Sequence, residues 1–175
     1  AGDWQYIGSQ GVIQEHYEIF KSISRLYFSD DLSGRLILTA GMGGMGGSQP
    51  LAAKMAGANI IVVDVNEDNI DKRLSIGYVD KKTDSLDQAL SWIDDAKRKG
   101  ENVSIAVIGN AATVYQDILD RGIVPDIVSD QTAAHDLHYG YVPENYSLEE
   151  VIRVRQSNPK KLESDAGASI AKEVR

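Results

Sequence analysis

The sequence predicts an α/β protein with a mostly parallel sheet and helices on both of its faces. Three features support this prediction: short apolar runs rich in β-branched residues recur along the chain, segments with helical spacing of apolar residues lie between them, and glycine-rich or polar turns separate the two. Strands that alternate with helices form parallel sheets, and right-handed crossovers place the helices on both faces. We therefore expect a three-layer α/β/α arrangement.

The predicted elements follow from apolar periodicity and from helix start and stop signals. Strands are expected at 35–40, 59–64, 103–108 and 126–129, and helices at 12–28, 49–58, 67–76, 85–98 and 111–121, with Gly100 and Gly122 as helix ends. Residues 1–11 show no clear period, and residues 130–146 form a long polar loop. Ser147 and Glu150 resemble a capping box that opens another helix, and Pro159 separates that helix from a last one.

The length and composition indicate one globular domain, residues 1–175, or one domain with a small appendage. The chain has 18 basic and 26 acidic residues and a formal net charge of −8, which disfavours nucleic acid and anionic membranes as partners. The lack of cysteine excludes disulfides, thiolate metal sites and a cysteine nucleophile within the chain, and it fits a reducing compartment. No apolar run approaches the ~20 residues of a membrane span. Because the chain opens on Ala1 and a helical pattern continues to Arg175, we expect a fragment of a longer protein.

A glycine-rich turn is the strongest functional motif. Residues 41–46 (GMGGMG) match G-x-G-x-x-G between a predicted strand and a predicted helix, and Asp64 ends the next strand. Such glycines let main-chain N–H groups approach a pyrophosphate, and the carboxylate accepts bonds from ribose hydroxyls, which favours NAD over NADP. The alternative is a flexible turn with a solvated aspartate. Ser48 is expected to cap the following helix, while Pro50 indicates a longer loop than the common dinucleotide turn.

Polar residues follow the other predicted strands, where parallel sheets bind their ligands. Asn110 offers a donor and an acceptor for an amide or ribose, with a helix N-cap as the favoured alternative. Gln131 and Thr132 suit the same task, with turn chemistry as their alternative. His135 is a possible general acid or base, although a solvated loop histidine is the simpler interpretation.

A metal site is not predicted. His135 and His138 are close in sequence, but a third ligand at suitable spacing is not evident, since His16 belongs to a distant helix. Met42 and Met45 could cover a flat ring, yet packing is the more ordinary role for methionine.

Five segments together resemble urocanase (urocanate hydratase), and their order and spacing span most of the chain. They are YIGSQG at 6–11, GMGGMGGSQPLAA at 41–53, GNAA at 109–112, DQTAAHD at 130–136 and GYVP at 140–143. The resemblance implies the central, Rossmann-like NAD-binding domain of that enzyme, inserted between N- and C-terminal parts that form the catalytic core. The catalytic residues, including a cysteine near the active site, would lie outside this chain.

The resemblance also implies an activity. In the family, tightly bound NAD⁺ acts as an electrophile: the imidazole of urocanate attacks the nicotinamide ring while water adds, which gives 4-imidazolone-5-propanoate. This lyase reaction belongs to histidine degradation in the cytoplasm, and the complete enzymes are homodimers. We expect the fragment alone to be inactive.

The matching positions imply a set of NAD contacts. They are Gly44, Met45, Gly46, Asp64, Asn110, Ala111, Gln131, Thr132, Ala133, Ala134, His135, Tyr141 and Val142. Three departures stand out: Asp64 replaces the glutamate of many relatives, Asn69 stands where relatives often have arginine, and residues 137–139 differ from the usual loop.

Two other functions remain open from the sequence. One is a stand-alone NAD-dependent dehydrogenase, for which His135 is the only plausible acid or base. The other is a non-catalytic NAD-sensing module, in which cofactor binding reshapes the 130–146 loop.

Overall fold

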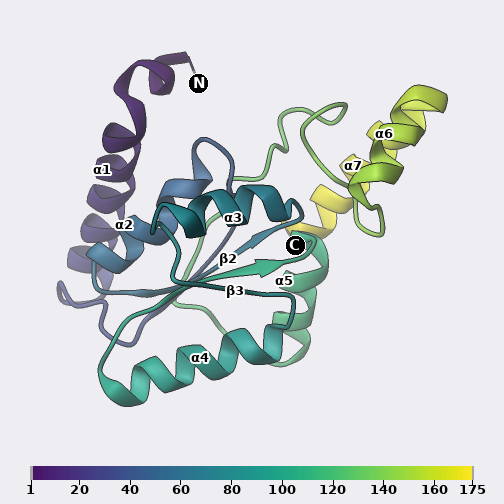
Figure 1. Cartoon of the computed structure of the whole chain (residues 1–175). Coiled ribbons are helices and arrows are strands. Elements are labelled where there is room, and N and C mark those ends of the chain that lie inside the picture. Colours follow the sequence, from purple (N-terminus) through teal and green to yellow (C-terminus); the bar gives the residue numbers. More distant parts are fainter. Residues whose placement is uncertain (1, 175) are drawn as a thin grey trace.

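A computed structural model describes residues 2–174, and the side chains of residues 7–174. The strands are β1 (Leu36–Ala40), β2 (Asn59–Asp64), β3 (Lys81–Thr83), β4 (Ser104–Ile108) and β5 (Ile127–Val128). The helices are α1 (Gly2–Tyr27), the short 3₁₀ helix η1 (Gly46–Ser48), α2 (Gln49–Met55), α3 (Glu67–Ser75), α4 (Leu86–Lys99), α5 (Ala111–Asp120), α6 (Leu148–Ser157) and α7 (Pro159–Glu173) (Figure 1).

The strands form one parallel sheet in the order β3-β4-β2-β1-β5. After β1 the chain forms β2 beside it, then β3 at the edge and β4 between β3 and β2. It then returns through α5 to place β5 on the other side of β1. The order of strands therefore reverses at β1. A crevice at the carboxyl end of such a reversal point is where open parallel sheets bind ligands.

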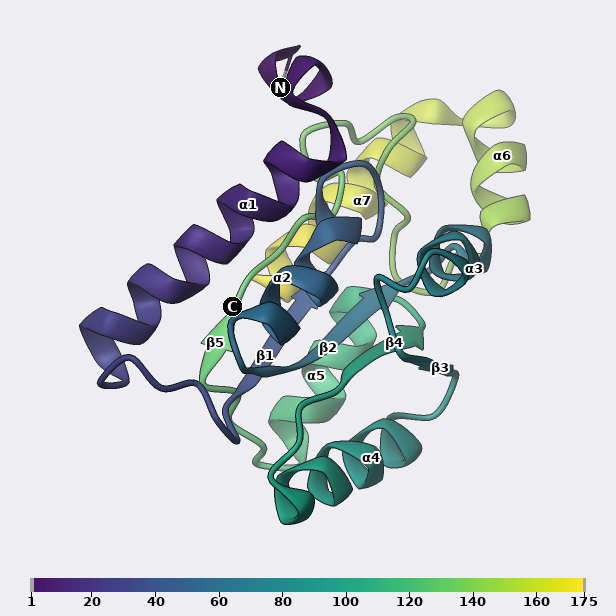
Figure 2. The same ribbon diagram turned by 60° about the vertical axis from the view of Figure 1, so that its left-hand side comes forward.

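Helices cover both faces of the sheet (Figure 2). Ile60 and Val62 of β2 pack toward α1, α2 and α3, whereas Ile61 and Val63 pack toward α4 and α5. Successive side chains of a strand point to opposite faces, so a strand covered on both faces needs an unbroken apolar run. All four of these side chains are fully buried. The predicted three-layer α/β/α fold is confirmed.

Glycine and cap residues set several helix ends as predicted. Gly100 and Gly122 follow α4 and α5 with φ of 68° each, in the left-handed region that glycine adopts without strain. At α6 the capping box is formed: the Ser147 hydroxyl accepts the Glu150 N–H at 3.1 Å, and the Glu150 carboxylate accepts the Ser147 N–H at 2.8 Å.

Three sequence expectations need correction. Helix α1 begins at Gly2 rather than at residue 12. A break at Gly8 (φ 65°, ψ −176°) explains why residues 1–11 show no single period, and Ala1 itself lies outside the described residues.

Strand β3 was not expected because Lys81 and Lys82 are polar. It lies at the edge of the sheet, where the Lys81 ammonium is 4.8 Å from the Trp92 ring centroid. The Lys82 ammonium forms ion pairs with the carboxylates of Glu67 and Asp71 on α3.

Helix α2 is shorter than expected and is not capped by the Ser48 side chain. It ends at Met55 because Gly57 (φ 98°) turns the chain, and the Ala58 N–H donates to the Ala53 carbonyl at 3.0 Å. The Ser48 hydroxyl donates instead to the Met45 carbonyl at 2.9 Å. Across the described part of the chain, no helix combines the length and the apolar character needed to cross a bilayer.

Candidate functional site

A cavity of about 470 Å³ lies at the carboxyl ends of β1, β2 and β4, on the side where the strand order reverses. It is lined by Gly41, Gly43, Val63, Asp64, Val65, Asn66, Asn69, Gly109, Asn110, Ala111, Gln131, Thr132, Ala133, Tyr139, Gly140, Tyr141, Val142, Leu148, Val151, Ile152 and Arg155. Its volume is within the range of small-molecule sites. Polar groups from the strand ends form one wall, and apolar side chains of α6 contribute to another.

The glycines of the loop after β1 divide into two groups. Gly41 and Gly46 are required by the fold: Gly41 has a φ of 87°, and a Cβ on Gly46 would lie 1.9 Å from the Gly41 carbonyl oxygen. Gly43 and Gly44 are different, because a Cβ on either would meet nothing within 4 Å and neither has a left-handed φ. Packing within the described chain therefore does not require glycine at these two positions, and the absence of side chains leaves the main chain open to close approach by a ligand.

The same loop presents free main-chain donors. Among the described residues, the N–H groups of Gly43, Gly44 and Met45 donate to no protein acceptor. Successive unpaired amides in a turn make a concave binding place for an anion. As Pro50 indicated, the loop continues into a 3₁₀ turn before α2 begins at Gln49.

Asp64 joins this loop to the end of β2. Its carboxylate accepts the Met42 N–H at 2.5 Å and the Asn66 N–H at 2.7 Å. Each carboxylate oxygen has a further lone-pair site, so the side chain still has acceptors for hydroxyl groups in the cavity. Met42 itself is buried beneath the loop at 1% exposure, which makes it a packing residue.

Asn110 is the N-cap of α5, which is the role that its sequence position favoured. Its side-chain oxygen accepts the Ala112 N–H at 3.0 Å and caps α5, and its amide donates to the Val142 carbonyl at 2.9 Å. The residue thereby fixes the 130–146 loop across the end of β4. One N–H and one lone pair of the amide are left for a ligand.

Asp130 organises the turn that follows β5. Its carboxylate accepts the Thr132 N–H and the Thr132 hydroxyl, each at 2.8 Å, and the Gln131 N–H donates to the Ala40 carbonyl at 2.8 Å. The turn chemistry considered for Gln131 and Thr132 is present. Both residues nevertheless line the cavity.

Tyr141 connects the cavity to the C-terminal helix. Its hydroxyl donates to the Glu173 carboxylate at 2.6 Å, and its side chain is only 3% exposed. Burial, assisted by the negative charge of Asp130, raises the pKa of the Glu173 carboxyl to about 7 although the Tyr141 hydrogen bond opposes the shift. Burial likewise raises the pKa of the Tyr141 hydroxyl.

Eight of the thirteen predicted contacts line this cavity. They are Asp64, Asn110, Ala111, Gln131, Thr132, Ala133, Tyr141 and Val142. Gly44, Met45, Gly46, Ala134 and His135 do not line it. Gly44 and Met45 continue the glycine-rich loop, Gly46 is buried beneath it, and His135 is exposed.

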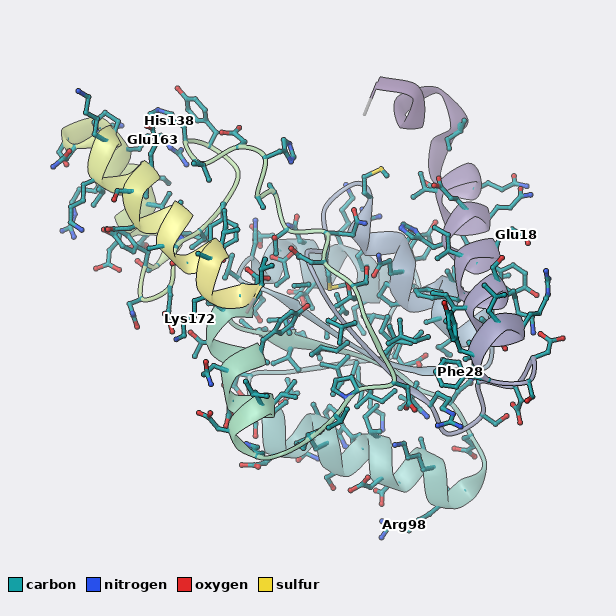
Figure 3. The ribbon with its side chains drawn as sticks, turned by 180° about the vertical axis from the view of Figure 1, so that it is seen from behind. Glu18, Phe28, Arg98, His138, Glu163 and Lys172 are labelled. Atoms are coloured by element: carbon teal, nitrogen blue, oxygen red, sulfur yellow. The ribbon has the colours of Figure 1, made fainter. Side chains whose placement is uncertain are left out.

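The three histidines occupy separate places. His138 bonds Glu163 of α7 at 3.0 Å (Figure 3). His16 of α1 is buried and bonds the Ser48 hydroxyl at 2.7 Å, and burial lowers its pKa. The Ser48 hydroxyl also lies 2.9 Å from the Met45 carbonyl oxygen, so it links His16 to the loop. The helix that seemed distant in sequence thus touches the end of the glycine-rich loop.

Sequence reasoning missed the contribution of α6 to the cavity. Leu148, Val151 and Ile152 line the cavity, and the Arg155 guanidinium donates to the His138 carbonyl at 2.7 Å and lies 4.8 Å from the Tyr139 ring centroid. The capping-box pattern of Ser147 and Glu150 indicated a helix here, but only the path of the 130–146 loop brings it to the site.

A larger hollow of about 820 Å³ lies between α5, β5 and α7. Its lining is mostly apolar, and the glycine-rich loop does not contribute to it. We therefore place the function in the cavity beside the glycine-rich loop.

The sequence matches the family model described as the Urocanase Rossmann-like domain over residues 8–175. The matched range includes the glycine-rich loop, Asp64 and all the residues that line the cavity.

Proposed function

The chain belongs to the urocanase family, and from this premise we propose that it is the NAD⁺-binding domain of a urocanate hydratase, a single domain over residues 1–175 within a larger enzyme. The cavity beside the glycine-rich loop would hold the cofactor. When bound, NAD⁺ supplies an electrophilic nicotinamide ring to the imidazole of urocanate while water adds to give 4-imidazolone-5-propanoate. On the family resemblance, we propose a cytoplasmic, homodimeric enzyme of histidine degradation.

The observation that carries the proposal is that main-chain amides without an acceptor and a carboxylate lie side by side in the same loop region. The N–H groups of Gly43, Gly44 and Met45 have no acceptor among the described residues, and Asp64 accepts the N–H of Met42 in the same loop. A diphosphate needs closely approaching main-chain donors, and a ribose needs an acceptor beside them. The residues present therefore fit a dinucleotide.

The charge of the site favours NAD⁺ over NADP⁺. The Asp64 carboxylate would accept bonds from the ribose hydroxyls and repel a 2′-phosphate at the same place. Asn69, at the position where relatives often have arginine, also lines the cavity and offers no positive charge to such a phosphate.

The isolated chain should not hydrate urocanate. The titratable side chains that line the cavity are Asp64, Tyr139, Tyr141 and Arg155, and Asp64 and Arg155 are already engaged by main-chain groups of the two loops. His135, which a stand-alone dehydrogenase would need as acid or base, is exposed and does not line the cavity. This placement weighs against the dehydrogenase alternative.

The test is an assay of the complete product of the reading frame that encodes this sequence. The purified product should carry NAD⁺ that is released on denaturation. When it is mixed with urocanate, the ultraviolet absorbance of urocanate should fall as the substrate is hydrated. The 175-residue chain, mixed with urocanate and NAD⁺, should leave that absorbance unchanged. A complete product that lacks NAD⁺ and leaves urocanate intact would overturn the proposal, and turnover by the chain alone would overturn its assignment as a non-catalytic part.

A further inference from the structure

Arg73 reaches from the last turn of α3 to the side of the glycine-rich loop. Its guanidinium Nη2 donates to the Gly43 carbonyl at 2.8 Å. A Cβ on Gly47 would lie 2.1 Å from the Arg73 Nε. Gly47 therefore leaves room for the guanidinium, and the two positions are matched in shape although they are far apart in the sequence.

This contact sets the direction of one peptide group. The Gly43 carbonyl accepts both the Arg73 guanidinium and the Gly47 N–H, the latter at 3.1 Å. All described peptide bonds are trans, and in a trans peptide the carbonyl and the next N–H point in opposite directions. With its carbonyl held toward Arg73, the peptide directs the Gly44 N–H away from α3, and this N–H donates to no described protein acceptor.

The guanidinium also brings a positive charge that no carboxylate among the described side chains pairs with directly. The guanidinium carbon of Arg73 lies 5.7 Å from the centroid of the Tyr78 ring. Its Nε is buried and bonds no described acceptor. Arginine stays protonated in proteins, and a cation on the carbonyl polarises the peptide so that its N–H becomes a stronger donor.

We propose that Arg73 is a positioning residue for the diphosphate of the dinucleotide: it holds the Gly43–Gly44 peptide so that the Gly44 N–H faces the ligand, without touching the ligand itself. This inference rests on the proposed function only for the identity of the ligand. The loop conformation that Arg73 maintains exists in the unliganded chain and can be measured there.

The experiment compares Arg73→Met and Arg73→Lys with Lys72→Met in the isotope-labelled chain. Lys72 is an exposed cation in the same helical turn with no side-chain partner among the described residues, so its loss controls for net charge. In the unliganded protein, the Gly44 amide resonance should move in Arg73→Met and stay in place in Lys72→Met. Titration with NAD⁺ should show roughly tenfold weaker binding for Arg73→Met, a smaller loss for Arg73→Lys and no change for Lys72→Met.

Urea unfolding of each variant separates a local effect from loss of the fold. If Arg73→Met does not fold, Arg73→Lys takes its place. Because lysine keeps the charge but lacks the planar fork of the guanidinium, Arg73→Lys should still shift the Gly44 resonance and weaken NAD⁺ binding. An unmoved Gly44 resonance with unchanged affinity in the folded variants overturns the inference, as does an equal loss in Lys72→Met. If the wild-type chain shows no NAD⁺ binding while the Gly44 resonance still moves in Arg73→Met, the proposed function fails and the role of Arg73 in shaping the loop stands.

Discussion

Two glycine-to-alanine substitutions in one loop should have opposite consequences. In Gly46→Ala the new methyl group would lie 1.9 Å from the Gly41 carbonyl oxygen, which is a main-chain atom and not the end of a flexible side chain. In Gly43→Ala the methyl group would meet nothing within 4 Å and would stand in the cavity that Gly43 lines. The first change should therefore reduce stability, and the second should reduce ligand binding only.

The magnitudes follow from packing and chain entropy. Forcing a methyl group into a filled place costs about 1–3 kcal/mol, whereas replacing glycine by alanine at a compatible backbone position favours folding by about 0.4–1 kcal/mol through the unfolded chain. We expect Gly46→Ala to lose about 1–2 kcal/mol, which for a domain of this size lowers the melting temperature by about 2–8 °C. Gly43→Ala should keep or slightly increase the wild-type stability.

Urea unfolding followed by circular dichroism measures the first effect, and NAD⁺ titration of the two folded variants measures the second. The reasoning is refuted if Gly46→Ala is as stable as the wild type. It is equally refuted if Gly43→Ala binds NAD⁺ as tightly as the wild type does, because the ligand would then not occupy the open space beside this glycine.

Three further predictions concern charged and polar positions of the site. Asp64→Asn should weaken NAD⁺ binding by roughly tenfold or more and reduce the preference over NADP⁺, because it removes the charge and the acceptor of one loop amide; equal affinities for wild type and variant in competition titrations would contradict this. Glu173→Gln should flatten a pH dependence: since burial, with Asp130, raises the folded-state pKa of Glu173 from 4.5 to about 7, the folded chain binds the proton more tightly and the wild type loses stability as pH rises from about 4.5 to about 7. Urea midpoints across that range should fall for the wild type more than for the variant, and parallel curves would speak against the shift. Asn69→Arg should strengthen NAD⁺ binding by roughly tenfold through a charge-assisted bond to the cofactor, and calorimetry that shows unchanged or weaker binding would rule out this role for the position.

Four of the five strands and most helix ends could be predicted because local chemistry determines them. A strand buried on both faces must be continuously apolar, which identifies β2 and β4 from sequence alone. Ser147 and Glu150 form their capping box within four residues of chain. Strand β3 could not be found this way, because its polar lysines reflect an edge position that only the assembled sheet creates.

The site was predictable where the chain approaches it from strand ends and unpredictable where tertiary contacts bring residues in. The carboxyl ends of parallel strands must meet at one edge, so Asp64, Asn110 and Gln131 could be grouped from their order along the chain. The α6 wall reaches the cavity only because the 130–146 loop crosses the sheet edge. Arg73 carries no motif at all, and its significance appears only from its distance to the Gly43 carbonyl.

The most direct test of a dinucleotide site in this cavity is the amide spectrum of the labelled chain during titration with NAD⁺ at millimolar concentrations. We expect other parts of the proposed enzyme to complete the enclosure of the cofactor, so binding to this chain should be weak but saturable. The shifts should concentrate at Gly43, Gly44 and Met45 and around Asp64, and NADP⁺ should reproduce them poorly. Saturable shifts confined to the hollow between α5, β5 and α7, or no saturable shift anywhere, would contradict the assignment.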